Sequence, residues 1–291
     1  MKRLSVIVAF AFLTCPLAGN SASAFVLGEP SLGGLITKWE PGPNTASVVN
    51  AGSTGLTATG TLGTPGGATW SIMGSGVNNS FGDGFHPPGF DSATSDFDTL
   101  ATPAADGWEA AQVRAALDLW ASVSGFTNLG MVADGGVVPG GFVPDDASAA
   151  LGDIRVGAYP FILGPANVVI LEEAKNPGTY GCVGDYGADG GDIHVNNDML
   201  PAAPNQLTWV DNPSDVAGNG EYDFFTVMLH EVGHALGLNH TTVQGSIMQM
   251  YSDRGGAQQL LGADDIEGIK ALYGPAPNGS APSAPENLRI Q

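Results

Sequence analysis

The stretch HEVGHALGLNH, residues 230–240, holds three of the five histidines in a chain of 291 residues. His230 and His234 are four residues apart, so on a helix their imidazoles project from the same face. Gly237 lets the chain leave that helix in a conformation that other residues resist, and the turn can then bring His240 back to the same place. Three converging imidazoles predict a tetrahedral metal site, with zinc as the metal.

Glu231 follows the first histidine and is not needed as a ligand. Three neutral nitrogen donors leave the fourth position of a tetrahedral zinc open to water, as in a catalytic site, whereas four protein ligands close a structural site. The Glu231 carboxylate can hydrogen-bond that water. The alternative is an amphipathic helix that carries histidines by chance. The full pattern His-Glu-x-x-His-x-x-Gly-x-x-His is too demanding to favour it.

Apolar residues recur at helical spacing in three segments of the chain. These segments are 108–124, 222–238 and 262–274. Asp106 and Asp223 are the expected N-caps of the first two helices. Asp264 and Asp265 lie in the first turn of the third helix, where the helix dipole favours acids, and Gly274 follows its end. The spacing therefore predicts three helices.

Strand composition marks 69–73, 153–161 and 166–173. The Gly/Thr-rich segment 51–68 indicates a loop or a loose hairpin. The segment 74–106 is rich in Gly, Asp and Pro and has no clear period, which indicates an insertion or a surface excursion. Strands interspersed with the three helices predict an α+β fold.

The net charge is −20, from 29 acidic against 9 basic residues. Such a surface repels phosphate backbones, which argues against nucleic-acid binding. An acidic surface suits a soluble secreted protein, and clustered Asp residues suit calcium. Of the two cysteines, Cys15 lies in the apolar leader, so the mature chain keeps Cys182 alone and has no internal disulfide.

The chain divides into three parts by composition. Residues 1–24 have a basic start, an apolar run and a small-residue cleavage site, which predicts a secretory signal peptide. Residues 25–274 form the expected catalytic domain, and residues 275–291 a Pro/Ser-rich linker or tail. We therefore expect a secreted monomer, extracellular or periplasmic, with no membrane segment after signal removal and no nucleic-acid partner.

The zinc pattern resembles that of the metzincin metallopeptidases. Met248, eight residues after His240, is similar in its spacing to the methionine turn of the matrixin (matrix-metalloproteinase-like) branch. Further pieces resemble that family in order along the chain: Lys38-Trp39 and TWSIM (69–73), QVRAALDLWASVSGF (112–126), GDIRV (152–156), GGDIHVNND (190–198) and DDIEGIKALYG (264–274). The resemblance implies a zincin-like metzincin catalytic domain, with a twisted, mostly parallel mixed sheet, three helices and a Met-turn.

The resemblance also implies a secreted zinc endopeptidase that acts on protein or peptide substrates. His230, His234 and His240 would bind the zinc, and Glu231 would act as the general base. The substrate would bind extended along a sheet edge, for which 166–173 is the candidate. Two alternatives are a catalytically inactive zinc-binding module for adhesion or protein binding, and a calcium-stabilised structural protein.

The sequence departs from the family pattern at its further metal sites. Matrixins commonly hold a second, structural zinc with three histidines and an aspartate, but only His194 falls where a ligand is expected. Carboxylates in the Asp-rich loops, at Asp185, Asp192 and Asp198, suit calcium better than zinc. Two usual acidic calcium ligands are replaced by Asn196 and Met199. We therefore expect one zinc per chain, and calcium, if bound, only adds stability.

Other departures affect latency and specificity. No prodomain cysteine motif precedes the domain, and Cys182 is either a metal cap or an unpaired thiol. Met250 replaces the proline usual two residues after the Met, and Tyr251 could form a pocket wall or a polar group near the zinc. By resemblance, Thr226 lines the main specificity pocket, which its small size would leave open; the alternative is that it simply packs on the helix.

Overall fold

The computed structural model describes thirteen stretches of the chain. These are residues 25–28, 34–43, 45–53, 55, 57–77, 93–100, 107–136, 151–159, 172–174, 191–197, 208–210, 221–249 and 258–277. The predictions for the signal peptide, Cys182, Met250, Tyr251, most of the 74–106 insertion and nearly all of the tail fall outside these stretches. In the described stretches, no helix is both long and apolar enough to cross a membrane.

A five-stranded sheet forms the centre of the fold, in the order β5-β4-β6-β8-β7. Its strands are β4 (Gly66–Ile72), β5 (Phe126–Met131), β6 (Ile154–Tyr159), β7 (Glu172–Ala174) and β8 (Ile193–Asn196). The first four in spatial order are parallel, and β7 is antiparallel to β8 at one edge. The predicted mixed, mostly parallel sheet is therefore confirmed, with the end of the predicted segment 166–173 at its edge.

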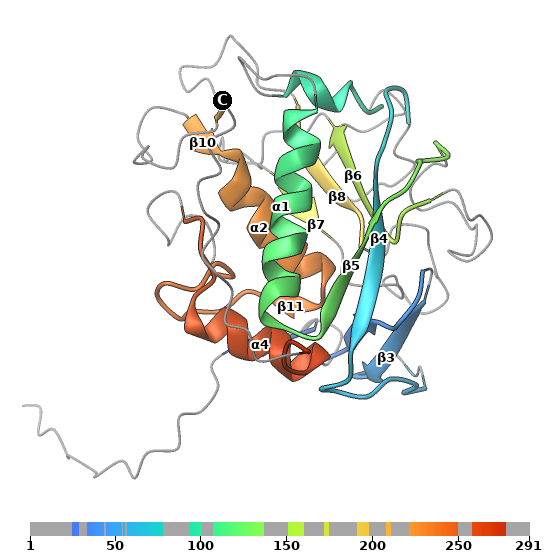
Figure 1. The fold of residues 1–291 in the computed structure, drawn as a ribbon, viewed down its shortest axis with the longest axis vertical. Coiled ribbons are helices and arrows are strands. Elements are labelled where there is room, and N and C mark those ends of the chain that lie inside the picture. The colour runs from blue at the N-terminus through green and yellow to red at the C-terminus, as the bar shows by residue number, and fades with distance from the viewer. Residues whose placement is uncertain are drawn as a thin grey trace, which may run out of the picture.

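Helices α1 (Trp108–Val123) and α2 (Phe224–Ala235) pack against each other over one face of this sheet (Figure 1). Apolar residues from the helices and from alternate positions of β6 and β8 share one core, because successive strand residues point to opposite faces. Helix α4 (Ala263–Tyr273) lies at the foot of α1, where it closes this core. All three predicted helices are therefore confirmed.

Three of the four predicted helix-end signals are confirmed, including Asp264 and Asp265 in the first turn of α4. The Asp223 side chain accepts a hydrogen bond from the Thr226 N–H at 2.7 Å and caps α2, as expected. Gly274, with φ of 77°, ends α4 as expected. The predicted cap of α1 at Asp106 is wrong. Gly107 caps α1 instead, with φ of 77° and no side-chain hydrogen bond, because glycine reaches this left-handed conformation without strain.

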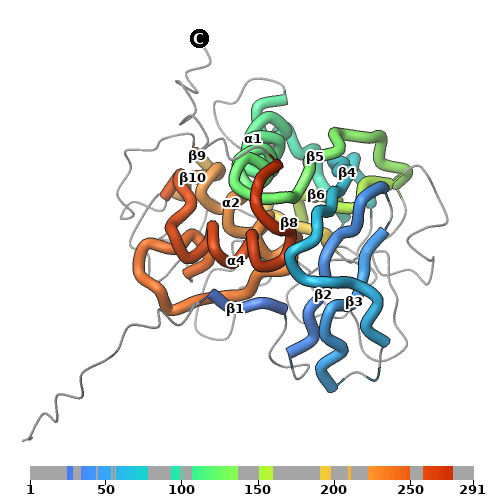
Figure 2. The backbone as a smooth tube through the Cα atoms, turned by 60° about the horizontal axis from the view of Figure 1, so that its bottom comes forward, coloured from blue at the N-terminus to red at the C-terminus, as the bar shows by residue number. Residues whose placement is uncertain are grey.

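Smaller sheets surround the core, including a hairpin that the sequence did not predict. Strands β2 (Ile36–Trp39) and β3 (Ala46–Asn50) pair antiparallel and lie beside each other below β4 (Figure 2). Lys38-Trp39 and 69–72, two of the stretches that resemble the family, therefore lie in different sheets, the first in the hairpin and the second in the central sheet. Strands β9 (Thr208–Val210) and β10 (Glu221–Asp223) form a further two-stranded sheet, which is parallel.

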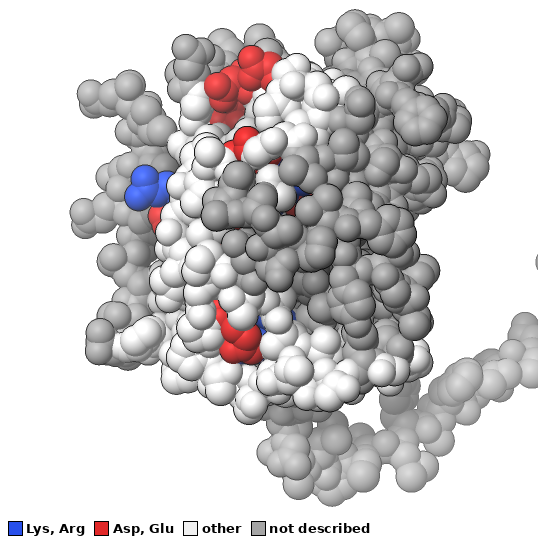
Figure 3. All heavy atoms as spheres, turned by 90° about the vertical axis from the view of Figure 1, so that its right-hand side faces the viewer, with Lys and Arg blue, Asp and Glu red and all other residues white. Residues whose placement is uncertain are grey.

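The N-terminal end of the described chain lies next to the end of α2. Strand β1 (Val26–Leu27) pairs antiparallel with β11 (Leu238–Asn239). Figure 2 shows β1 beneath α4, far in sequence from both of these partners. On another side of the molecule, Figure 3 shows the acidic groups of the described residues in small separate patches among uncharged residues.

Candidate metal centre

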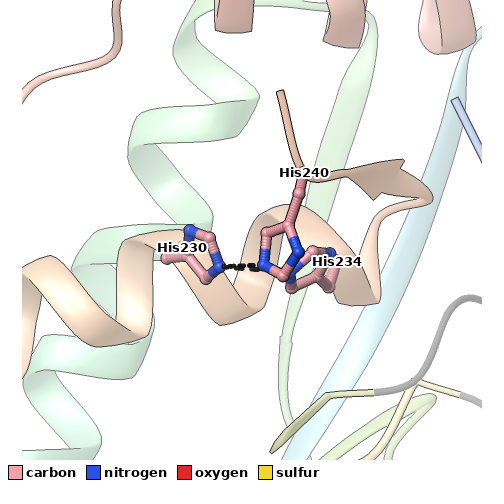
Figure 4. A group of neighbouring side chains, drawn as sticks. All are labelled: His230, His234 and His240. Carbon is pink, nitrogen blue, oxygen red and sulfur yellow. Dashed lines mark hydrogen bonds between the residues drawn. The ribbon is translucent and has the colours of Figure 1, made fainter. Parts of the chain in front are cut away.

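The three histidines of the quoted stretch meet at one point, as predicted. His230 and His234 project from α2, and His240 follows β11 (Figure 4). The distances between their Nε2 atoms are 3.1 Å, 3.1 Å and 3.2 Å. Nitrogens bound to one tetrahedral zinc at the usual bond length would lie roughly 3.3 Å apart. The spacing therefore fits a single metal ion.

The hydrogen bonds of the other ring nitrogens fix the tautomers of two of these histidines. His230 Nδ1 lies 2.7 Å from the Ile247 carbonyl oxygen, and His234 Nδ1 lies 2.9 Å from that of Leu238. Carbonyl oxygens only accept, so both Nδ1 atoms carry the proton. The Nε2 lone pairs then point at one another at close range, an arrangement that a shared cation stabilises.

The C-terminal end of α2 is held by two side chains that lie far from it in the sequence. The Trp39 indole N–H donates to the Ala235 carbonyl at 2.8 Å, and the Tyr273 hydroxyl donates to that of Leu236 at 2.8 Å. These bonds satisfy carbonyls that a helix end leaves free. Gly237 follows with φ of 104°, and a Cβ there would lie 2.5 Å from the Thr37 carbonyl oxygen. The predicted need for glycine at this turn is confirmed.

Asn239 joins this turn to the N-terminal strand. Its side-chain oxygen accepts from the His240 N–H at 2.6 Å, and its amide donates to the Gly28 carbonyl at 2.8 Å. The Gly28 N–H in turn donates to the Gly237 carbonyl at 3.0 Å. Residues 26–28 are therefore part of the support for His240.

Met248 follows His240 in a turn that packs against α2, in agreement with the Met-turn that the resemblance predicts. It is buried against α2 at Gly233, where a Cβ would come within 2.3 Å of the Met248 sulfur. A side chain at position 233 would therefore push the methionine away from the helix. The turn also supplies the Ile247 carbonyl that accepts from His230.

Asp265 anchors the Met-turn, a role that the sequence did not indicate. Its buried carboxylate accepts from the Ser246 hydroxyl and from the N–H groups of Ile247 (2.7 Å), Met248 (3.2 Å) and Gly262 (2.7 Å). Burial raises the pKa of Asp265 above its ordinary value, although these hydrogen bonds oppose the shift. Asp265 therefore acts on His230 through the turn.

Glu231 lies beside the histidines, where the sequence placed it. The residue is 3% exposed, and its Oε1 atom is 3.7 Å from His230 Nε2. The carboxylate therefore reaches the region where the three Nε2 atoms converge, within range of a water held there.

Glu231, the histidines and Met248 all fall within the stretch that matches a known protein family. The pattern that defines the matrixins matches residues 171–274. Over these residues the chain has the sequence of a matrixin. Matrixins are zinc metalloendopeptidases, so the histidine triad within this stretch implies a catalytic zinc.

Similar proteins occur in animals and plants. The chain is 37% identical to the interstitial collagenase of Sus scrofa and 38% identical to that of Bos taurus, over 102 residues in each case. It is 47% identical over 57 residues to metalloendoproteinase 5-MMP of Arabidopsis thaliana. Each collagenase match covers 35% of this chain but only 18% of the collagenase. The match to the plant protein covers 20% of this chain and 16% of that protein.

Of the residues considered for further metals, His194 and Asp192 lie apart from the triad. Buried His194 on β8 packs against the Tyr159 ring, with 4.4 Å between ring centroids, and Asp192 faces Arg155. Asp185 and Asp198 lie outside the described residues. Within the part of the chain that the structure describes, the triad alone groups three or more His, Cys, Asp or Glu side chains closely enough for a metal.

We expect Asp265→Asn to loosen the metal centre without touching it. In asparagine an NH2 group replaces one carboxylate oxygen and cannot accept the hydrogen bonds that this oxygen accepts in Asp265. The Met-turn, and with it the hydrogen bond from His230 to the Ile247 carbonyl, should therefore weaken. Zinc affinity should fall roughly 10-fold or more, as when outer-shell partners are lost. Competition with a chromophoric chelator measures this. Glu267→Gln, an exposed change on the same helix, is the control, and equal affinities for both variants would refute the role of Asp265.

Proposed function

We propose that this protein is a zinc-dependent endopeptidase of the matrixin type, with His230, His234 and His240 as ligands of one catalytic zinc. The observation that carries the proposal is the convergence of the three Nε2 atoms with two tautomers fixed by backbone carbonyls. When bound, zinc polarises the scissile carbonyl and lowers the pKa of a bound water toward ~7.

Glu231 is the proposed general base. It takes a proton from the attacking water and passes it to the amine of the departing peptide. Its support is its position, since the carboxylate lies 3.7 Å from His230 Nε2 and is almost fully buried. Burial keeps the carboxylate in one orientation and away from competing bulk water.

The proposed substrates are proteins or peptides that bind in an extended conformation. Strand β7 is the antiparallel edge of the central sheet and lies next to α2, which carries His230 and His234. An edge strand presents free backbone N–H and C=O groups, so an extended peptide can add to it as a further strand. The scissile bond would then lie near the triad.

We also propose that the protein is a secreted monomer, either extracellular or periplasmic. Residues 1–24 would be removed as a signal peptide, 25–274 would form the catalytic domain and 275–291 a tail. Calcium, if bound, would add stability only. The alternative is an inactive zinc-binding module for adhesion or protein binding, but such a module has no need to keep Glu231 together with all three histidines.

Cleavage of casein and a peptide mixture by residues 25–291 tests the proposal. We expect internal peptide bonds to be cut, the reaction to stop when a chelator removes the metal, and zinc to restore it. A zinc-loaded protein that cuts neither casein nor any peptide would instead support the inactive module. A protein that retains no zinc would support a calcium-stabilised structural protein.

Thr226 is the proposed determinant of the pocket for the residue after the scissile bond. It lies one turn before His230, fully buried, and its hydroxyl accepts from the Gln258 N–H at 2.9 Å. Because threonine is small, we expect peptides with Leu, Met or Phe at that position to be preferred, and Thr226→Leu to reduce cleavage before Phe most. Library profiling measures both, with the exposed Thr127→Leu as control. A preference for Gly or Asp would contradict the assignment.

A further inference from the structure

A buried arginine lies on the face of the sheet that points away from the helices. On β6, Ile154 and Val156 join the core under α1 and α2, so Arg155 between them points to the other face. Arg155 is only 1% exposed. A guanidinium stays protonated at any ordinary pH, so this face holds a permanent buried cation. Such a cation requires nearby negative charge.

Two aspartates from different strand ends supply that charge. Asp134, which follows β5, accepts from Arg155 Nε at 2.9 Å and from Nη2 at 3.0 Å, as a bidentate pair. The Ser71 hydroxyl of β4 also donates to Asp134, at 2.8 Å. On the other side, Asp192 Oδ2, just before β8, lies 3.7 Å from Arg155 Nη1. The cluster therefore joins four neighbouring strands.

This arrangement does not fit calcium at Asp192, where the sequence suggested it. Calcium takes 6–8 oxygen ligands at about 2.3–2.6 Å, and a fixed positive charge beside one of them opposes its binding. The nearby Asp153 carboxylate is engaged with β4, since one oxygen accepts from the Thr69 N–H at 2.6 Å and from its hydroxyl at 2.7 Å. Burial alone would raise the pKa of Asp134, but the hydrogen bonds and charge of Arg155 hold it below its ordinary value.

We propose that the Arg155 guanidinium neutralises Asp134 and Asp192 in place of a bound calcium ion. The Arg155 ion pairs then link β8 to β4, β5 and β6 without a metal ion. Strand β8 carries the edge strand β7, so the edge proposed for substrate is held by an arginine rather than by an ion at Asp192. The proposal does not depend on catalytic activity.

Thermal unfolding of the zinc-loaded protein, with calcium titrated up to millimolar concentration, tests this directly. Asp192→Asn should lower the Tm by several degrees, on the order of 5 °C, and leave the rise caused by calcium the same as in the wild type. Arg155→Gln should lower the Tm by roughly 10 °C, because two buried carboxylates lose their counter-charge. Calcium should then stabilise Arg155→Gln more than it stabilises the wild type.

Arg114→Gln is the matched control, because Arg114 is largely exposed in a pair with Asp118 and its loss should leave the Tm nearly unchanged. If Asp192→Asn abolished a calcium-dependent rise seen in the wild type, Asp192 would be a calcium ligand and the proposal would be wrong. An Arg155→Gln variant as stable as Arg114→Gln would also overturn it. Should Arg155→Gln fail to fold, the Asp192→Asn comparison still decides.

Discussion

Glu231→Gln is expected to lower kcat/KM for peptide hydrolysis on the order of 10³- to 10⁵-fold while zinc stays bound. Glutamine keeps the size of the side chain but cannot take a proton from water. The loss of the general base and of the negative charge near the reacting atoms both contribute. Because Glu231 is not one of the three converging nitrogen donors, the metal content should not change.

Peptide kinetics and elemental analysis of the same preparation measure this expectation. Glu267→Gln makes the same chemical change at an exposed position on α4 and should behave as the wild type. A Glu231→Gln variant that cut peptides at a near wild-type rate would show that another group is the base. A variant that lost its zinc would leave the role of Glu231 in catalysis unsupported.

His240→Ala is expected to have the next largest effect, through loss of the metal. His240 is the exposed member of the triad and the one that reaches the site from a turn rather than from α2. Without it two imidazoles remain, so zinc affinity should fall by more than the ~10–100-fold that loss of an outer-shell partner costs. Peptide hydrolysis should fall with zinc occupancy.

Zinc content after dialysis and residual hydrolysis measure the effect of His240→Ala. His86→Ala removes a histidine outside the quoted stretch and should leave both quantities unchanged. Full zinc retention by His240→Ala, with hydrolysis intact, would mean that His240 is not a ligand. Loss of zinc from His86→Ala would mean that a further ligand had been overlooked.

The metal centre could be predicted from sequence because its geometry is mostly local. Four-residue spacing on a helix fixes the relation of His230 to His234, and Gly237 supplies the one turn that returns His240. The same applies to the capping of α2 by Asp223, which lies three residues from its partner Thr226. Local spacing carries such information directly.

The supports of the centre could not be predicted, because they depend on contacts between distant residues. Trp39 and Tyr273 are 234 residues apart, yet a hydrogen bond joins them and both hold the end of α2. From the sequence, the position of Asp265 in the first turn of α4 was explained by the helix dipole alone, and nothing local indicated its hydrogen bonds to the Met-turn. Likewise, Asp192 suggested calcium until the fold placed Arg155 beside it.

Titrating the metal-free protein with zinc while following peptide hydrolysis tests the central claim most directly. One catalytic zinc predicts that hydrolysis is absent without metal, rises linearly as zinc is added and stops rising at one equivalent per chain. Hydrolysis that is already complete without zinc, or that needs a second equivalent to reach its maximum, would contradict the account.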